Sequence, residues 1–326
     1  MQSKRDKLLS FLKESKGIWV SGEWLSGELG ISRAAINKHI HQLRNIGYPI
    51  ETSTRKGYCL GQFPDLLVAE EIREGLGTRV FGVRDIMSLD ETDSTNLRAK
   101  DLAAGGAPEE TIVVAGTQTE GRGRKGRTWF SPSGGGVYIS LILRPLLAPS
   151  EAPRITLMTG VAAAEAIISL TRLDARIKWP NDILVRGKKI AGILTEISTE
   201  MDRIDYVVVG VGLNVNIQRE SLAEGLRERA TSILMETGES FSRVGLLKAF
   251  LKHFERYYKI LQDKGFEPIR NRWKELSDNI GQRVSVELIG DVRTGRVVDI
   301  DPDGLLILED DQGSIQRIAS GDVTLL

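Results

Sequence analysis

The chain has 326 residues, with 44 Lys and Arg balanced by 44 Asp and Glu, and 41% of its residues are hydrophobic. These values are typical of a soluble globular protein and leave room for two or three domains. The single cysteine, Cys59, excludes an intramolecular disulfide and a multi-cysteine zinc site. We find neither a signal peptide nor an apolar run of about 18 residues, so we expect a cytoplasmic protein with no membrane partner.

Charge is distributed unevenly along the chain. Residues 1–62 contain ten Lys and Arg but five Asp and Glu, so their net charge is +5 and that of the remainder is −5. A basic N-terminal segment on an acidic body favours a polyanion, such as a nucleic acid, as the partner of that segment.

Residues 4–45 have the pattern of a helix-turn-helix. Apolar residues recur at helical spacing over residues 4–15 and 33–45, and a shorter helix is expected between them. Two candidate N-caps and one glycine that ends a helix separate the three segments; these residues are Ser21, Ser32 and Gly30. A helix, a Gly-containing turn and a capped second helix are the parts of this motif.

The exposed face of the third helix and a basic hairpin are the candidate DNA contacts. Two short extended runs, residues 48–52 and 57–60, flank a basic tip and predict a wing. Arg and Asn can read base edges in the major groove, and Lys can contact phosphate. The predicted DNA contacts are Ser32, Arg33, Ala34, Asn37, Lys38, Arg55 and Lys56. A helical protein–protein module is the alternative, because helix pairs with basic faces are common.

Residues 61–65 contain Pro64 and predict a linker, after which helical and strand patterns alternate. Helices are expected at residues 67–76, 97–103, 155–170, 246–261 and 267–276. Strands are expected within residues 79–89 and at 111–117, 137–143, 176–185, 190–197 and 206–215. The tail is expected to contain short strands at residues 284–289, 294–299, 305–308 and 314–318, and no ligand contact is assigned there.

The most informative stretch is the loop at residues 118–129, which we call the basic loop. Its central seven residues carry four cations and three glycines, and Trp129 and Phe130 follow. Glycines allow the backbone to approach a ligand, and clustered like charges repel one another unless an anion lies among them. A solvated basic hairpin tip or a nonspecific phosphate patch is the alternative interpretation.

Two further patterns point to a pocket. Pro180 interrupts the strand expected at 176–185, which suggests either a bulge that directs Asn181 and Asp182 into a site or an ordinary turn. Gly210 and Gly212 lie on one face of their strand. They leave room either for a flat bicyclic ligand or for close packing of a helix.

Three blocks together resemble the signature of the biotin–protein ligases. They are GRGRKGR at residues 121–127, KWPND at residues 178–182 and KKIAGIL at residues 188–194. The resemblance extends over nearly the whole chain, including the N-terminal segment. It therefore implies the two-function form, a biotin ligase that is also the repressor of the biotin operon.

The resemblance implies an α+β fold with three domains. These are a winged helix-turn-helix DNA-binding domain at residues 1–62, a mixed-sheet α/β catalytic domain of the biotin/lipoate ligase type at 66–277, and a small SH3-like β-barrel at 278–326. The turn residues at close spacing in the tail agree with a small barrel.

The resemblance also assigns ligand contacts. It implies biotin contacts at Ser94, Thr95, Asn96, Gln118, Arg122, Gly123, Arg124, Lys189 and Gly192. It implies nucleotide contacts at Arg124, Arg127, Trp129, Asn181 and Asn214. The Gln118 amide offers the donor and the acceptor that a cyclic urea needs. For Ser94 and Thr95, simple capping of the following helix is the alternative.

The implied reaction has two steps. Biotin and ATP form biotinyl-5′-adenylate and pyrophosphate, and a lysine of a carrier protein then attacks the adenylate. The predicted catalytic residues are Arg122, Arg124, Asp182 and Lys189. The cations stabilise charge on the phosphates, and Asp182 accepts a proton from the attacking amine or orients it. Mg²⁺ is expected mainly on the phosphates, without an assigned protein ligand, and no Walker motif is present.

The expected partners are the biotin carboxyl carrier protein of acetyl-CoA carboxylase, other biotin-dependent carboxylases, operator DNA and a second copy of the chain, because a dimer reads two half-sites. Two other functions stay open. A biotin-sensing repressor without catalysis could lose Asp182, Lys189 or the basic loop, yet all are present. A lipoate or octanoate ligase relative would prefer a long apolar channel, and the combined blocks favour biotin.

Overall fold

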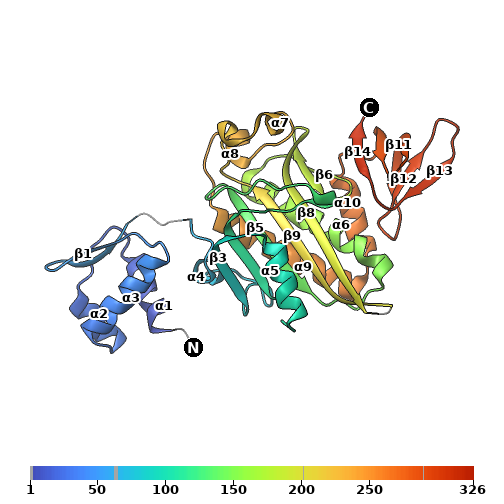
Figure 1. Cartoon of the computed structure of the whole chain (residues 1–326). Coiled ribbons are helices and arrows are strands. Elements are labelled where there is room, and N and C mark those ends of the chain that lie inside the picture. Colours follow the sequence, from blue (N-terminus) through green and yellow to red (C-terminus); the bar gives the residue numbers. More distant parts are fainter. Residues whose placement is uncertain (1–2, 62–64, 201, 289) are drawn as a thin grey trace. The chain divides into compact units, whose positions relative to one another are not determined.

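Three helices and a hairpin make up the N-terminal unit, Met1–Glu70 (Figure 1). The computed structural model describes residues 3–61, 65–200, 202–288 and 290–326. The elements of this unit are α1 (Lys4–Glu14), α2 (Gly22–Leu29), α3 (Arg33–Asn45), β1 (Ile50–Ser53) and β2 (Gly57–Leu60). Buried leucines and isoleucines from all three helices form one core, which includes Leu12, Leu25 and Ile40.

Serine caps determine where α2 and α3 begin. The Ser21 hydroxyl accepts hydrogen bonds from two backbone amides in the first turn of α2, and the Ser32 hydroxyl accepts one from the Ala35 amide. Gly30 ends α2 with a φ of 61°, in the left-handed region that favours glycine. The predicted helix-turn-helix is therefore confirmed.

β1 and β2 pair antiparallel and form the predicted wing. β1 begins at Ile50, two residues later than predicted, because the Tyr48 amide donates to the Leu43 carbonyl near the end of α3. The Tyr48 side chain is buried in the core of the unit. Of the predicted linker, residues 62–64 lie outside the described residues.

A seven-stranded mixed sheet is the centre of the second unit, Glu71–Leu326 (Figure 1). The strand order is β3-β4-β5-β9-β8-β7-β6; β3 and β4 are parallel, and the other neighbours are antiparallel. The strands are β3 (Ile86–Thr92), β4 (Ile112–Gln118), β5 (Gly136–Leu143), β6 (Ala175–Lys178), β7 (Asp182–Val185), β8 (Lys188–Glu200) and β9 (Arg203–Asn214). β5 is buried along its whole length, as expected for a central strand covered on both faces.

Helices cover both faces of this sheet. α5 (Thr95–Ala104) packs on β4, β5 and β9, with Ala99 and Ala103 against Val113 and Val208. α6 (Ala152–Thr171), α9 (Arg243–Lys264) and α10 (Glu267–Leu276) pack on one another, and α6 and α9 cover the opposite face (Figure 1). The short helices are α4 (Ala69–Arg73), η1 (Arg124–Gly126), η2 (Pro149–Glu151), η3 (Arg219–Ser221), α7 (Glu224–Arg227) and α8 (Ile233–Thr237).

Two predictions at the start of the body are wrong. The helix predicted at residues 67–76 is the five-residue α4, and the strands predicted within 79–89 reduce to the start of β3 at Ile86. Residues 79–81 form a turn in which three successive backbone amides donate to the Glu255 carboxylate. A local pattern could not show this turn, because its acceptor lies on α9.

Residues 176–185 form a hairpin and not one strand interrupted by a bulge. β6 and β7 pair antiparallel, with Lys178 opposite Asp182, and the turn contains a cis bond before Pro180. The turn that was the alternative interpretation is therefore correct. β6 is also an edge strand, in agreement with the proline beside it.

The segment Pro149–Thr171 is long and apolar enough to cross a membrane, although no such run was expected from the sequence. Within the most apolar part of this segment, 61% is buried inside the protein. A buried core helix has the same length and composition, so this single helix is weak support for a membrane span.

The C-terminal residues form an antiparallel sheet in the order β13-β12-β11-β10-β14. Its strands are β10 (Arg283–Glu287), β11 (Val292–Ile300), β12 (Leu306–Glu309), β13 (Ile315–Ile318) and β14 (Asp322–Leu325). Four of these strands were predicted, but β14 was not, because its four residues pair with the distant β10. The predicted end of the first strand at residue 289 lies outside the described residues, and the domain boundaries stay predictions.

Candidate functional site

A cavity of about 780 Å³ lies beside the N-terminus of α5, over strands β7, β8 and β9. The strand register places Asp182, Gly192 and Gly212 opposite one another, so they share one face of the sheet. Every residue predicted to contact biotin or nucleotide or to act in catalysis lines this cavity, namely Ser94, Thr95, Asn96, Gln118, Arg122, Gly123, Arg124, Arg127, Trp129, Asn181, Asp182, Lys189, Gly192 and Asn214. The structure thus brings the predicted set together, and the individual roles stay predictions.

Gln118, at the end of β4, fixes the first turn of α5. Its Oε1 accepts hydrogen bonds from the backbone amide (2.8 Å) and the hydroxyl (3.1 Å) of Thr95, and its Nε2 donates to Ser131 Oγ at 2.8 Å. Ser94 occupies the N-cap position but makes no capping hydrogen bond through its side chain. Simple helix capping by the Ser94 hydroxyl is therefore wrong, and this hydroxyl stays a candidate for a ligand contact.

The Asn96 amide is fixed by the protein on both sides. Its Nδ2 donates to Glu196 Oε2 at 2.9 Å and to the Leu194 carbonyl at 3.2 Å, and its Oδ1 lies 2.6 Å from Ser140 Oγ. Gly210 leaves the space for this amide, because a Cβ there would lie 2.0 Å from Asn96 Oδ1. The arrangement gives Asn96 one orientation at the wall of the cavity.

The Trp129 indole lies on the two glycines of the cavity floor. A Cβ at Gly212 would lie 2.4 Å from Nε1 of the indole, and one at Gly192 would lie 2.9 Å from Cζ3. Of the two interpretations of the Gly210 and Gly212 pair, close packing of a helix is correct at Gly210, where Asn96 of α5 fills the space. At Gly212 the Trp129 indole fills the space instead. The indole Nε1 is buried and has no acceptor among the described residues.

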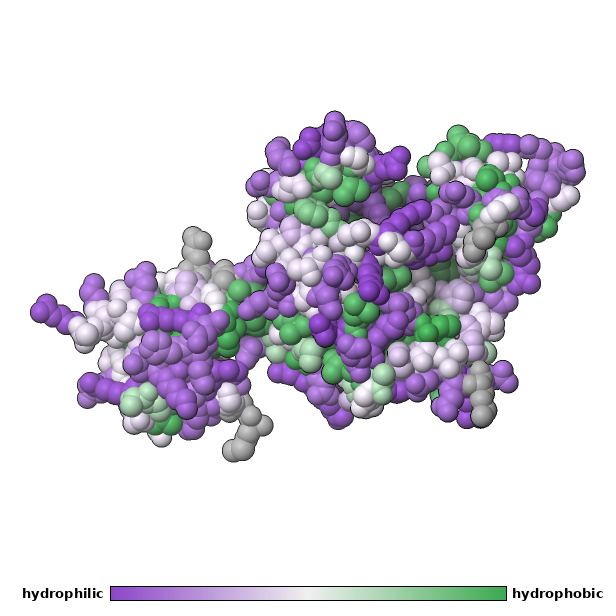
Figure 2. Space-filling view, in the orientation of Figure 1, coloured by the Kyte–Doolittle hydropathy of each residue, from purple (hydrophilic) through white to green (hydrophobic). Residues whose placement is uncertain are grey.

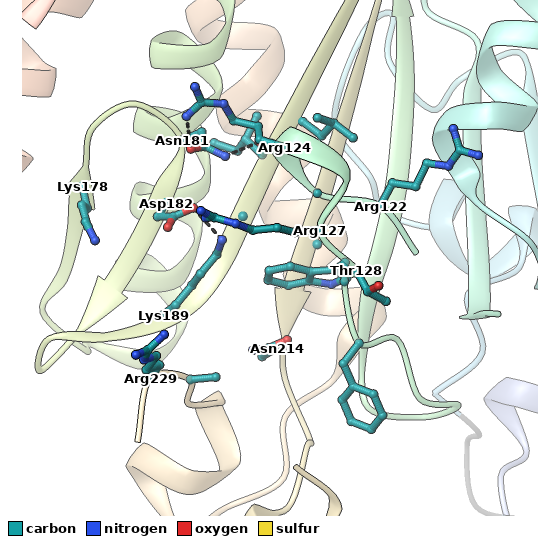
Figure 3. Close-up of a pocket in the computed structure, with 18 of the residues that line it drawn as sticks. Arg122, Arg124, Arg127, Thr128, Lys178, Asn181, Asp182, Lys189, Asn214 and Arg229 are labelled. Carbon is teal, nitrogen blue, oxygen red and sulfur yellow. Dashed lines mark hydrogen bonds and ion pairs between the residues drawn. The ribbon is translucent and has the colours of Figure 1, made fainter. Parts of the chain in front are cut away.

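Asp182 and Lys189 form an ion pair at the edge of the floor (Figure 3). The distance from Lys189 Nζ to Asp182 Oδ1 is 2.6 Å. The same ammonium lies 5.1 Å from the centre of the Trp129 ring, a cation–π distance. The backbone of Lys189, near the start of β8, is held by the segment that follows α7, because its amide donates to the Arg229 carbonyl at 2.8 Å.

The arginines of the basic loop differ in their surroundings. Arg124 Nη1 donates to Asn181 Oδ1 at 3.1 Å. Burial lowers the pKa of Arg124, and the charges of Asp322 and Asp182 oppose this effect. Arg122 points away from the Asp182–Lys189 pair (Figure 3).

The C-terminal sheet contributes to the cavity, which the sequence did not indicate. Glu287, Asp322, Val323 and Thr324 are among the lining residues. Figure 2 shows hydrophilic side chains gathered between the α7–α8 segment and the C-terminal strands. No ligand contact was assigned to the tail from the sequence, but β14 places Asp322 beside the basic loop, with Lys125 Nζ 3.3 Å from its Oδ2.

Other lining residues were also missed. They are Thr128, Phe130, Lys178 and several residues between Ile217 and Ala230, including Arg229. Lys178 is the first residue of the KWPND block and Thr128 directly follows the GRGRKGR block, so both could have been included on that ground. Asn214, which was predicted, has a structural contact as well, since its Nδ2 donates to the Thr231 carbonyl at 2.9 Å.

The predicted DNA-contact residues all lie on the surface of the N-terminal unit. They are Ser32, Arg33, Ala34, Asn37 and Lys38 on α3 or its cap, and Arg55 and Lys56 at the wing tip. Arg33 pairs with Glu23 at 2.8 Å, and both side chains are largely exposed. Lys56 Nζ lies 5.7 Å from the centre of the Trp19 ring. An exposed recognition helix with a basic wing fits a nucleic-acid interface.

Comparison with known proteins identifies the family to which the chain belongs. Residues 88–214 match the Biotin/lipoate A/B protein ligase family, residues 4–59 match an HTH domain, and residues 280–326 match the Biotin protein ligase C terminal domain. The bifunctional ligase/repressor BirA of Bacillus subtilis (strain 168) is 40% identical over 321 residues, which cover 98% of each chain. This chain belongs to the family of bifunctional biotin ligase/repressors.

Two further members of the biotin ligase family are similar to this chain. The biotin–[acetyl-CoA-carboxylase] ligase of Paracoccus denitrificans is 34% identical over 69% of this chain and 94% of that protein. The biotin protein ligase from Aquifex aeolicus, solved in complex with biotin and ATP, has a TM-score of 0.65 and 31% identity, over 74% of this chain and 99% of that one. The predicted family and the α+β fold class are thus confirmed.

Proposed function

We propose that this chain is an ATP-dependent biotin–protein ligase that also represses transcription through its N-terminal unit. The observation that carries the proposal is a single cavity that combines the start of α5 and Gln118 with the cations Arg124 and Lys189. Biotinyl-5′-adenylate has a polar ring at one end and a phosphate at the other, so it needs both kinds of partner.

The start of α5 offers the partners for the biotin ring. The Ser94 hydroxyl makes no capping hydrogen bond, and Gln118 Nε2 has a second N–H besides the one given to Ser131, so these two groups supply an acceptor and donors for a cyclic urea. Trp129 supplies an apolar wall, and its unpaired indole N–H is a further donor that a ligand atom can satisfy.

In the first step, an oxygen of the biotin carboxylate attacks the α-phosphorus of ATP. The bond from that phosphorus to the bridging oxygen breaks, and pyrophosphate leaves. Arg124, Arg127 and Lys189 line the cavity and supply the positive charge that the phosphate oxygens need. Arg122 must turn inward from its present direction to take part.

Magnesium accompanies ATP in such reactions, and the residues present fit an ion that arrives on the phosphates. Within the described ranges, no group of three or more His, Cys, Asp or Glu side chains could enclose a metal. Asp182 Oδ1 pairs with Lys189, and the single side-chain oxygen of Asn181 accepts from Arg124, so the second carboxylate oxygen of Asp182 is the one further oxygen of this pair. The ion would neutralise charge on the phosphates, which is the usual mode of Mg²⁺.

In the second step, the neutral amine of an acceptor lysine attacks the carbonyl carbon of the adenylate. An amide bond forms, and AMP leaves with the bonding electron pair. A free lysine has a pKa of about 10.4, so a nearby carboxylate is needed to accept its proton or to orient it. We assign this role to Asp182, whose contact with Lys189 places it at the edge of the cavity.

We propose the biotin carboxyl carrier protein of acetyl-CoA carboxylase, and the carriers of other biotin-dependent carboxylases, as acceptors. Operator DNA is the proposed partner of the N-terminal unit, and a homodimer in the cytoplasm would read two half-sites. Sedimentation of the chain with and without biotin and ATP tests ligand-dependent dimerisation. Equal dimerisation constants would contradict it.

Incubation of the full-length chain with radiolabelled biotin, ATP and a purified biotin carrier domain tests the catalytic function. We expect ATP-dependent label on the carrier and none on a carrier whose acceptor lysine is replaced by arginine. A sensor without catalysis would bind biotin and label nothing. A lipoate or octanoate ligase would instead transfer lipoate to its own carrier domain.

A further inference from the structure

The basic loop is linked to the C-terminal sheet through Asp322, the first residue of β14. Lys125 Nζ lies 3.3 Å from Asp322 Oδ2, and Arg127 pairs with the same oxygen. Arg124 Nη1 also lies 3.4 Å from the Gly321 carbonyl oxygen, to which it donates. Three cations of the loop therefore contact two adjacent residues of the C-terminal sheet.

Other contacts attach the C-terminal sheet to the body, so Asp322 reaches the loop from a fixed support. Arg154 Nη2 donates to Asp303 Oδ1 at 2.9 Å, and Arg270 Nη2 donates to Asp299 Oδ2 at 2.6 Å. Neither pair includes a residue of the basic loop. The loop can therefore leave Asp322 without detaching the sheet.

Charge explains why the loop needs this partner when no nucleotide is bound. Cations this close repel one another unless an anion lies among them. The Asp322 side chain is 22% exposed, whereas that of Arg127 is 64% exposed. Burial raises the pKa of Asp322, but the hydrogen bond from Lys125 and the charge of Arg127 outweigh it, so the pKa is lowered and the carboxylate is charged at neutral pH.

We propose that Asp322 competes with the phosphates of ATP for the cations of the basic loop. It binds Lys125 and Arg127 in the nucleotide-free chain and gives them up when phosphate oxygens arrive. This inference rests on the proposed function, in which the loop binds nucleotide. Asp322 is a positioning residue, because it acts through the loop and sets the ATP concentration at which the loop is occupied.

The full-length Asp322→Asn variant tests the competition. It retains the size of the side chain and removes the charge. The measurements are the dissociation constant of inorganic pyrophosphate, from calorimetry, and the KM for ATP in adenylate formation. We expect both constants to fall roughly threefold to tenfold, as the loss of one or two partly exposed ion pairs allows. The KM for biotin should not change.

Two further variants are matched controls. Asp311→Asn removes the same charge from an exposed ion pair with Arg283 in the same sheet, away from the loop. Asp322→Glu retains the charge at the tested position. Asp311→Asn should bind pyrophosphate within about twofold of the wild type, since an exposed pair contributes little. Asp322→Glu should do the same, because the carboxylate that competes with phosphate is retained.

An unchanged or higher KM for ATP in Asp322→Asn would overturn the inference. A failure of this variant to fold, when both controls fold, would also overturn it, because the carboxylate would then be a structural contact. If the wild type makes no adenylate from biotin and ATP, the proposed function itself is wrong. An active wild type with unaltered kinetics in Asp322→Asn rejects the role of Asp322 alone.

Discussion

Gly212 leaves the space that the Trp129 indole occupies, and any larger residue would collide with the ring. A Cβ at this position would lie 2.4 Å from Cε2 and Nε1 of the indole. Gly212→Ala must displace a ring that also lies 5.1 Å from the Lys189 ammonium. We expect kcat/KM for adenylate formation to fall by roughly fivefold to 150-fold, because overpacking costs about 1–3 kcal/mol. Pyrophosphate release with both substrates present measures it.

Gly27→Ala is the matched control for this substitution. Gly27 lies on α2 with no atom within 4 Å of the added Cβ. Adenylate formation should be unchanged and the melting temperature slightly higher, since Ala is favoured over Gly in a helix by about 1 kcal/mol. Wild-type activity of Gly212→Ala would show that the position of the indole does not matter.

Ser140 is a buried residue behind the site that the sequence did not single out. Its hydroxyl lies 2.6 Å from Asn96 Oδ1 and 2.8 Å from Thr95 Oγ1. Ser140→Ala leaves these groups without that partner. We expect the KM for biotin to rise about tenfold (~1.4 kcal/mol) and the KM for ATP to stay close to the wild-type value. Steady-state kinetics with each substrate varied in turn measures both.

Ser88→Ala is the matched control for Ser140→Ala, because it removes a buried serine hydroxyl that makes no such contact. The Ser88 hydroxyl is buried on β3 and has no hydrogen-bond partner in the described part of the chain. Its removal should leave both KM values unchanged and the stability equal or higher. A similar rise in the KM for biotin in both variants would contradict the role of Ser140.

Among the elements, α6, α9 and α10 meet at one carboxylate. Glu165 Oε1 accepts from the Tyr257 hydroxyl and from Arg272 Nε, each at 2.8 Å, and His253 Nδ1 lies 3.0 Å from Oε2. Burial raises the pKa of Glu165, but these hydrogen bonds outweigh it and lower the pKa to about 2. The charged form therefore stabilises the fold fully above the ordinary value of 4.5, and this contribution is lost as the pH falls towards 2.

Glu165→Gln should lower the free energy of unfolding by about 2 kcal/mol at pH 7. The difference from the wild type should shrink between pH 4.5 and pH 2, as urea denaturation at several pH values will show. Glu275→Gln is the control, because Glu275 pairs with Arg272 but is 64% exposed. It should cost less than about 1 kcal/mol. A Glu165→Gln deficit that is constant with pH would mean that packing, and not charge, is lost.

The elements that were predicted correctly depend on local signals. Gly30, which ends α2, and Ser32, which caps α3, lie directly before the apolar stripe of α3, so all three signals fall within residues 30–45. The wrong predictions depend on distant partners. The turn at residues 79–81 needs the Glu255 carboxylate on α9, and β14, which was not predicted, pairs with the distant β10.

At the scale of the whole molecule, the predicted site comes from sequence blocks whose residues fold onto one face of the sheet. Asp182 and Lys189 meet because β7 and β8 are adjacent, so their pairing was within reach of the sequence. The contact of Asp322 was not, since nothing in the tail indicates that β14 begins beside the basic loop. Ser140 was hidden in the same way, because its strand reads as ordinary core.

The division into Met1–Glu70 and Glu71–Leu326 predicts that DNA binding and ligation can be altered separately. Arg55 and Lys56 are exposed at the wing tip and do not line the cavity. If both contact phosphates, the Arg55→Ala/Lys56→Ala variant should bind all DNA sequences more weakly. The slope of log affinity against log salt should fall by about 0.9 for each lost contact. Carrier biotinylation should proceed at the wild-type rate.

Asn37→Ala, on the exposed face of α3, should behave differently. An asparagine that reads a base edge discriminates between sequences by about 1–3 kcal/mol, so this variant should narrow the gap between operator and unrelated DNA without changing the salt slope. Fluorescence anisotropy at several salt concentrations, with biotin and ATP present, measures both quantities.

Equal salt slopes for the wing variant and the wild type would contradict phosphate contacts at the wing. An unaltered preference for operator DNA in Asn37→Ala would show that α3 is not the reading helix.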